Sequence, residues 1–167
     1  MAGALGGWQL NTIWFLQSGD PWVPRSSGIY GFGDDFNADG QGSERPDRPV
    51  GDVPRSYSTR QWLDGTTGLK KDLFPLPPST ELRTGNLPRD FFRGPGFWRT
   101  DAAFVKTFPV PIGRAEKAQL QVRLEAFNLF NRINLYRPQT NLASSRFAIP
   151  GSAYPMRVVQ LAVKFVF

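Results

Sequence analysis

The sequence of 167 residues contains no cysteine and no histidine. These two absences exclude a disulfide, a thiol nucleophile, a Ser-His-Asp triad and a zinc site built from the usual ligands. Catalysis would then depend on carboxylate, lysine or tyrosine side chains alone, which leaves few chemical routes. We therefore expect a protein that is not an enzyme.

Long apolar runs are also missing. No stretch reaches the roughly eighteen apolar residues that a membrane-crossing helix needs. The opening residues, MAGALGGWQL, have neither the basic start nor the apolar centre of an export signal. The sequence thus predicts neither a membrane helix nor an export signal at this position.

Neither the positively nor the negatively charged residues form a long continuous run in the sequence. The 20 Lys and Arg residues outnumber the 14 Asp and Glu residues, but the arginines are scattered through loop-like sequence and build no basic face. Solvated loop charge explains this balance better than a phosphate-binding surface does. We expect no nucleic-acid partner.

The sequence does contain regular alternation. Four segments of roughly ten residues alternate apolar and polar side chains, which is the pattern of a β-strand with one apolar and one polar face. In the clearest segment, Leu120, Val122 and Leu124 alternate with Gln121 and Arg123. About ten residues is the length that a tilted strand needs to cross a hydrocarbon layer. The expected strands lie near residues 7–17, 97–108, 118–130 and 156–167.

The connections between these segments differ in length. They run long (near 18–96), short (near 109–117) and medium (near 131–155), and outer-membrane barrels alternate long extracellular loops with short periplasmic turns. Aromatic residues also cluster at the strand ends, where an interfacial girdle would lie. We therefore expect an all-β antiparallel meander of about four long strands, the C-terminal segment of a transmembrane β-barrel with a long irregular extracellular loop. The two longer connections would be extracellular and the short one periplasmic.

A structureless loop as long as 18–96 is rare in a compact domain. Either it folds as a lobe of its own, or it hides further elements: a helical turn in STRQWLDGT (58–66) and strands near Tyr57–Leu63 and Leu82–Leu87. A soluble β-sandwich that binds carbohydrate stays open as the alternative. It predicts that the apolar faces of residues 120–126 and 159–167 are buried against a second sheet.

Five stretches of the sequence are similar to one known family. They are LQSGDPW (16–22), ERPDRPVGD (44–52), NLPRDFFRGPGFWRTDAAFVKTF (86–108), LQVRLEAFNLFNRIN (120–134) and the closing VQLAVKFVF (159–167). In this order and spacing they resemble the C-terminal end of TonB-dependent outer-membrane receptors, in particular the Oar-like subgroup with a carboxypeptidase-regulatory-like N-terminal domain. The resemblance covers nearly the whole chain, and RLEAFNLFNR followed at a distance by a terminal Phe is its most specific part.

The resemblance implies a place in the outer membrane of a Gram-negative bacterium, with lipid around the barrel, substrate capture by the outside loops and energy supplied through TonB. It also implies a sorting signal for the barrel-assembly machinery in the terminal strand, here Leu161, Val163, Phe165 and Phe167. The plug domain and TonB box of such receptors have no counterpart in the sequence, and four strands cannot close a barrel. We therefore expect a fragment, and nothing identifies its substrate.

One stretch has the spacing of a calcium site. Asp35, Asn37 and Asp39 alternate ahead of Gly40 as oxygen ligands do in an EF-hand loop, but Pro46 stands where the bidentate acid belongs. A hydrophilic loop with Asx-turns is the simpler interpretation. Apart from this Ca²⁺ we expect no cofactor.

Four charged residues lie on the polar faces of the second and third segments: Arg99, Asp101, Arg123 and Glu125. With the short turn centred near Gly113, Asp101 would lie opposite Glu125 and diagonal to Arg123. We expect a wall of mixed charge that keeps a barrel lumen polar. A glycosidase fragment using Asp101 and Glu125 is not favoured, because the adjacent arginines keep both carboxylates ionised.

Aromatic residues of the long loop offer a surface for substrate: Trp22, Tyr30, Tyr57 and Trp62 could stack on a sugar or cap an apolar ligand. The same side chains could instead form the small hydrophobic core of a loop lobe, and this second interpretation is favoured. Burial separates the two, because a ring that stacks on substrate must be exposed.

Overall fold

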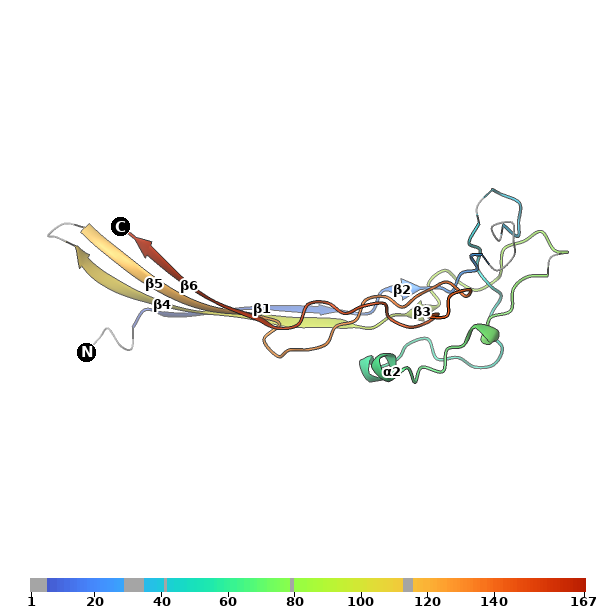
Figure 1. The fold of residues 1–167 in the computed structure, drawn as a ribbon, viewed down its shortest axis with the longest axis horizontal. Helices are drawn as coiled ribbons and strands as arrows, with labels where there is room; N and C mark the ends of the chain where they lie inside the picture. The colour runs from blue at the N-terminus through green and yellow to red at the C-terminus, as the bar shows by residue number, and fades with distance from the viewer. Residues whose placement is uncertain (1–5, 29–34, 41, 79, 113–115) are drawn as a thin grey trace. The chain divides into compact units, whose positions relative to one another are not determined.

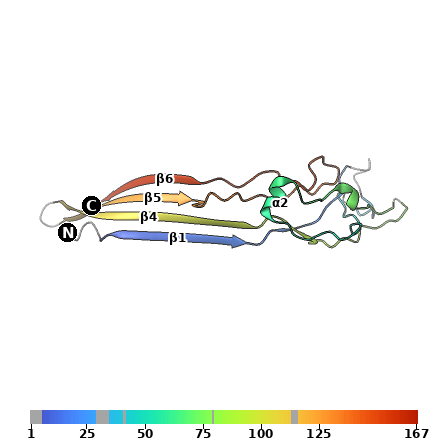
Figure 2. The same cartoon turned by 90° about the horizontal axis from the view of Figure 1, so that it is seen from below.

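The computed structural model describes residues 6–28, 35–40, 42–78, 80–112 and 116–167. Within these ranges four long strands form one sheet in the order β1-β4-β5-β6 (Figure 1). The strands lie side by side and alternate in direction (Figure 2). The expected all-β meander of about four long strands is confirmed. The strands are β1 (Trp8–Gln17), β4 (Phe97–Ile112), β5 (Glu116–Phe127) and β6 (Val158–Val166).

The chain divides into two compact units. The first, which we call the sheet unit, comprises Met1–Leu16, Trp98–Ile133 and Pro155–Phe167. The second, the loop unit, comprises Gln17–Phe97 and Asn134–Tyr154. Both long connections of the meander therefore contribute to one folded unit.

The loop unit contains only short elements within its described residues. Strands β2 (Pro21–Trp22) and β3 (Phe92–Arg93) pair with each other in antiparallel fashion. A helix, α2 (Thr59–Asp64), and a single 3₁₀ turn, η1 (Lys71–Leu73), complete the set. The helical turn predicted in residues 58–66 is confirmed.

Helix α2 has strong local signals at both ends. The Ser58 hydroxyl accepts the Gln61 N–H at its N-terminus, and the Gln61 side chain accepts the Ser58 N–H in return. Gly65 ends the helix with a φ of 66°, a left-handed conformation that glycine adopts at little cost. The strand predicted near Tyr57–Leu63 is therefore wrong, because this capping box directs the backbone into a helix.

The strand predicted near Leu82–Leu87 is also wrong. Gly85 and Leu87 donate their N–H groups to the carbonyls of Arg45 and Pro46, at 3.0 and 3.2 Å. A Cβ at Gly85 would lie 2.1 Å from the Pro46 backbone. This close crossing of two irregular segments uses the backbone groups that a strand ladder would need.

The loop unit has a hydrophobic core of its own. Trp22 stacks on Phe92 with ring centroids 5.0 Å apart, and Trp62 from α2 and Phe147 approach the Trp22 ring edge-on. Since Phe147 belongs to the second long connection, both connections build the same core. The long connection thus folds as a lobe, as the first alternative predicts, and it also contains the short elements β2, α2, η1 and β3. The buried members are Trp22, Val23, Trp62, Leu69, Phe74, Leu87, Phe92, Leu142, Phe147 and Ala148.

The connection between β4 and β5 is shorter than the predicted turn at 109–117. β4 continues to Ile112 and β5 begins at Glu116, so Pro109 and Pro111 lie within a strand. Thr107 donates its N–H to the carbonyl of Gly7 (2.9 Å), so the N–H groups at odd positions here point toward β1. Pro109 and Pro111 are at odd positions too, so their nitrogens lie on the side of β4 away from β5, where proline removes no donor from the β4–β5 ladder. Residues 113–115 lie outside the described ranges.

The register of the sheet sorts its side chains onto two faces. On the face that we call the apolar face, Phe108, Leu120 and Phe165 form one cross-strand row. The next two rows are Lys106–Val122–Val163 and Phe104–Leu124–Leu161. The faces of β5 and β6 thus have the apolar composition that their alternation predicts.

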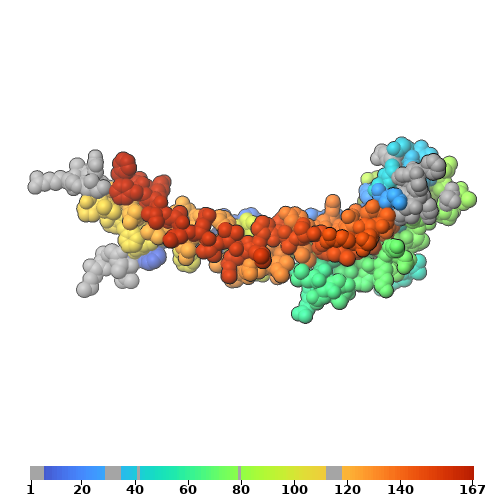
Figure 3. Space-filling model, viewed as in Figure 1, coloured from blue at the N-terminus to red at the C-terminus, as the bar shows by residue number. Residues whose placement is uncertain are grey.

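The apolar face is exposed. Leu124 keeps 47% of its surface accessible and Leu161 keeps 69%. The sandwich alternative requires these side chains to be buried against a second sheet, so it is not favoured. β6 forms one edge of the sheet, and its atoms, in red, lie uncovered on the near side of the space-filling view (Figure 3).

Candidate functional site: a barrel wall and a pocket in the loop unit

Aromatic rings gather at both ends of the apolar face. Trp8 and Phe108 lie toward the short turn, both within 5.4 Å of the Lys106 ammonium. At the other end, Phe130 lies 6.2 Å from Trp14 and 5.9 Å from Trp98. Ten residues of β4 separate the two ends, which is about 34 Å along a strand and about 24 Å across a membrane at a tilt near 45°. This height matches the apolar band of an outer-membrane barrel, about 25 Å.

Lys106 is the one charged residue in the three cross-strand rows of the apolar face described above. Its ammonium donates to the Gly6 carbonyl and lies 4.7 Å from the Trp8 ring and 5.4 Å from the Phe108 ring. The residue lies one row from the aromatic end of the face, where a lysine stem can run along apolar surface toward an interface. Near an interface such a charge costs little, in contrast to the membrane centre.

The four predicted wall charges form two pairs, each within one strand. Arg99 bonds Asp101 on β4 (2.8 Å), and Arg123 bonds Glu125 on β5 (2.9 Å). The predicted register is wrong, because Glu125 lies opposite Ala103 and not opposite Asp101. The pairing of Ile112 with Glu116 centres the turn on residue 114, and moving a turn centre by one residue moves the register by two.

Asp101 has a further role at the end of the sheet. Its second carboxylate oxygen accepts the N–H of Asn128 (2.9 Å), directly after β5. Asn128 and Asn131 adopt left-handed φ values of 54° and 51°, which asparagine tolerates better than most residues. The Asn128 side chain also bonds both backbone groups of Arg132. The FNLFNR stretch is therefore an ordered exit from β5, held by Asp101.

The predicted calcium ligands fall in a hydrogen-bonded loop. One oxygen each of Asp35, Asp39 and Glu44 lie within 4.8 Å of one another. Asp35 accepts the N–H groups of Asp39 and Gly40, and the Asn37 amide donates to Asp39. These contacts are Asx-turn contacts, and three oxygens are fewer than the six to eight that Ca²⁺ takes. Ca²⁺ binding here stays a prediction.

The predicted substrate aromatics lie mainly in the loop core. Trp22 is 2% exposed and Trp62 is 3% exposed, so neither ring can stack on a ligand. Tyr57 is half-buried and packs edge-on against Trp62 at 5.3 Å. Tyr30 lies outside the described residues. The stacking hypothesis is thus corrected for both tryptophans, and the core interpretation accounts for their burial.

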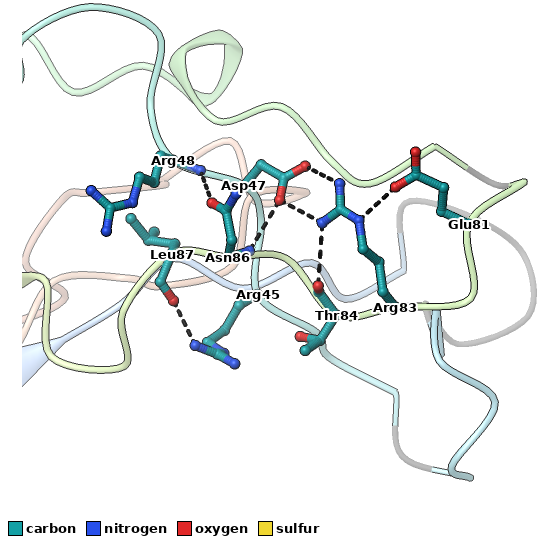
Figure 4. Close-up of polar contacts among 8 residues, drawn as sticks. All are labelled: Arg45, Asp47, Arg48, Glu81, Arg83, Thr84, Asn86 and Leu87. Atoms are coloured by element: carbon teal, nitrogen blue, oxygen red, sulfur yellow. Dashed lines mark hydrogen bonds and ion pairs between the residues drawn. The ribbon is translucent and has the colours of Figure 1, made fainter.

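A partly exposed ion pair between Asp47 and Arg83 ties two parts of the loop unit together (Figure 4). Asp47 accepts two hydrogen bonds from Arg83, at 2.7 and 2.9 Å, and the N–H of Asn86 at 3.0 Å. Chiefly through the Arg83 bonds, the pKa of Asp47 is lowered from its usual value, and the pKa of Arg83 is raised. The ERPDRPVGD stretch (44–52) therefore holds residues 81–87 in place. The scattered distribution of the arginines in the sequence did not predict this contact.

Sequence reasoning missed a pocket of about 350 Å³ in the loop unit. Residues of three short segments line it, from 17–20, 94–97 and 135–137, together with Tyr154. The Tyr136 and Tyr154 rings stack at 3.9 Å between centroids, and Phe97 meets Tyr154 edge-on at 4.9 Å. Asp20 and Arg137 contribute one charge of each sign.

Two glycines bring the first two of these segments together. A Cβ at Gly19 would lie 1.8 Å from the Gly94 carbonyl oxygen, and the Gly94 N–H donates to the Asp20 carbonyl (2.9 Å). A side chain at Gly19 would push the two backbones apart, whereas a Cβ at Gly94 would come no closer than 3.4 Å to its nearest neighbour, the Asp20 carbonyl oxygen. The paired motifs SGD (18–20) and RGPG (93–96) were the available signal, because glycines in both suggest a close backbone approach.

The comparisons with known proteins agree with this geometry. The model of one family, described as an outer membrane beta barrel domain, matches residues 1–160. The searches of curated proteins and of solved structures returned no match. Among the described residues there is no helix with the length and apolarity to span a bilayer. Since the family match covers far more than half of its residues, this chain belongs to the outer membrane beta barrel domain family.

Proposed function

We propose that the chain forms part of the wall and of the extracellular substrate-capture loops of a TonB-dependent receptor in a Gram-negative outer membrane. One observation carries the proposal: the sheet has an exposed apolar face with aromatic rings at both ends, and a polar face with two ion pairs. A barrel wall between lipid and a wet lumen needs these two faces.

The loop unit supports a receptor role in addition to a wall role. Both long connections leave the same end of the antiparallel sheet and fold into one lobe with a core and a pocket. Rigid loops on a barrel rim are suited to substrate capture. The stretches that resemble TonB-dependent receptors include two of the three segments that line this pocket, LQSGDPW and RGPGF.

The last strand supports assembly by the barrel-assembly machinery. Leu161, Val163, Phe165 and Phe167 are exposed, and β6 is an edge strand. An edge strand can pair with another sheet by strand addition. We propose that β6 pairs in this way with the machinery first and with a neighbouring barrel strand afterwards.

A chimeric receptor tests the proposal. The last four strands and their loops in a well-studied TonB-dependent receptor are replaced by this chain, and outer-membrane insertion and substrate uptake are measured. The matched control receives the corresponding strands of a second TonB-dependent receptor. We expect the chimera to insert in the outer membrane and to show heat-modifiable migration, with any remaining uptake lost when TonB is deleted.

Two results would contradict the proposal. Failure of the chimera to reach the outer membrane while the control inserts would reject the wall assignment. Uptake that persists without TonB would reject the receptor class while leaving the barrel wall intact.

A further inference from the structure

We propose that the pocket in the loop unit binds a neutral saccharide, with the stacked tyrosines Tyr136 and Tyr154 as its platform. The inference rests on the proposed function, since it names the class of substrate that the capture loops would take. A pocket of about 350 Å³ with a few convergent polar groups is large enough for a small ligand. The predicted substrate aromatics that the structure describes, Trp22, Tyr57 and Trp62, do not line it.

The platform is flat and partly open. Tyr136 and Tyr154 lie nearly parallel, with 19° between the ring planes, and Tyr136 remains 43% exposed. Phe97 supports Tyr154 from the edge. A pyranose ring presents a flat C–H face that packs on an aromatic ring, while its hydroxyls stay available around the rim.

The rim supplies the complementary polar groups. Asp20 offers acceptors, Arg137 offers donors, and Ser18 and Gln17 offer groups of both kinds. The Gln17 amide already donates to the Asp20 carboxylate (3.2 Å), which orients that acceptor. Adjacent sugar hydroxyls, each both donor and acceptor, match such a mixed set.

Charge favours a neutral ligand over an ionic one. The rim holds one carboxylate and one guanidinium, so its formal charges cancel and give no attraction for an anionic iron chelate or a phosphate. A zwitterionic peptide end could pair with both charges, but Asp20 and Arg137 are solvent-exposed, where single ion pairs contribute little. Stacking on the tyrosine platform depends on the ring area that the ligand covers and not on an ion pair shielded from water.

The pocket is preformed by backbone. The close approach at Gly19 and Gly94 fixes the two segments that present Asp20 and Phe97. Ligand binding then orders few additional groups, which reduces the entropic cost of association. A weak, open sugar site of this kind suits capture followed by release.

Saturation-transfer NMR on the full chain in detergent micelles tests the inference. The probes are the neutral trisaccharides maltotriose, cellotriose and chitotriose, with the dipeptide Ala-Ala as the zwitterionic comparison. We expect binding of at least one trisaccharide, weakened about tenfold in Tyr136→Ala and in Arg137→Ala. Tyr136→Phe keeps the ring and should bind within about threefold of wild type. Arg89→Ala removes an exposed arginine elsewhere in the loop unit and should change nothing.

The near-ultraviolet circular dichroism of the buried tryptophans reports whether each variant keeps the loop core. The inference is overturned if no trisaccharide binds, if the dipeptide binds in preference, or if Tyr136→Ala and Arg137→Ala bind as wild type does. Such results would leave the chimera result untouched. A chain that binds sugar but fails to assemble in the chimera would reject the proposed receptor instead.

Discussion

At the scale of single residues, Leu124 distinguishes a lipid-facing wall from a soluble surface. Leu124 lies in the third cross-strand row, when the Phe108 row at the turn end is counted as the first. It is paired with Phe104 and Leu161, near the middle of the apolar face. A lysine placed at the centre of the hydrocarbon layer costs about 2–4 kcal/mol. We predict that Leu124→Lys lowers the free energy of unfolding by this amount, measured by urea titration of the chimeric receptor folded in phospholipid vesicles.

Thr107→Lys provides the matched control for that substitution. Thr107 lies on the polar face, opposite Gln121, where an added charge remains in water. We expect its effect to stay within about 0.5 kcal/mol. Equal losses from the two substitutions would contradict the assignment of the two faces.

Asp47 gives the loop unit a pH dependence. Its pKa is lowered chiefly by the Arg83 hydrogen bonds and further by the N–H of Asn86, with burial opposing. The stabilisation is therefore present above the unfolded value of about 3.9 and is lost as the pH falls below it toward the folded pKa. We predict that thermal unfolding of the wild type shifts to lower temperature on acidification below about pH 4, and that Asp47→Asn removes part of this dependence.

Near-ultraviolet circular dichroism of the loop core measures this transition as a function of pH. Asp52→Asn changes an exposed carboxyl in the same stretch and should keep the wild-type pH profile. An Asp47→Asn variant with the pH profile of the wild type would show that the ion pair does not stabilise the loop unit.

At the scale of elements, α2 depends on its capping box. Ser58→Ala removes the hydroxyl that accepts the Gln61 N–H, and loss of such a cap costs about 0.5–2 kcal/mol. Because α2 places Trp62 in the loop core, we predict that thermal unfolding of this core moves to a lower temperature. Ser56→Ala, an exposed serine outside the helix, should leave the transition in place, and equal shifts would argue against the cap.

The long strands could be predicted from the sequence because alternation is a local property. β5 alternates strictly from Gln119 to Glu125, so both its existence and its faces followed from the residues alone. The register of β5 against β4 did not follow from the residues, because the turn was assigned to a stretch that includes Pro109 and Pro111. These are turn-forming residues in most contexts. The register of β4 explains why these prolines are tolerated, because their nitrogens lie on the side away from β5.

The loop core and the pocket could not be predicted in the same way. Trp22, Phe92 and Phe147 come from three distant stretches with no periodicity, and only the tertiary fold brings them together. The pocket depends on the close approach of Gly19 and Gly94. A sequence shows where the glycines are, but it does not show which backbone segment each glycine approaches.

At the scale of the whole molecule, the family assignment rests on the match over residues 1–160, and the sheet unit has the two-faced strands that this family requires. The sheet unit has one apolar and one polar face, as a barrel wall does, and the loop unit has a core and a pocket of its own. Four strands leave β1 and β6 as edges, whereas bacterial barrels close with eight strands or more. A complete wall therefore requires further strands beside these two edges.

Site-directed spin labelling along β5 tests the membrane wall most directly. Labels replace Gln121, Val122, Arg123 and Leu124 one at a time in the chimeric receptor folded in phospholipid vesicles, and collisions with oxygen and with a water-soluble nickel complex are measured. If the apolar face of β5 contacts lipid and its polar face contacts water, labels at 122 and 124 collide with oxygen and labels at 121 and 123 collide with nickel. The two responses then alternate along the strand. Labels at 122 and 124 that are shielded from both reagents would show that these side chains lie in a protein core. The assignment of the apolar face to lipid would then be wrong.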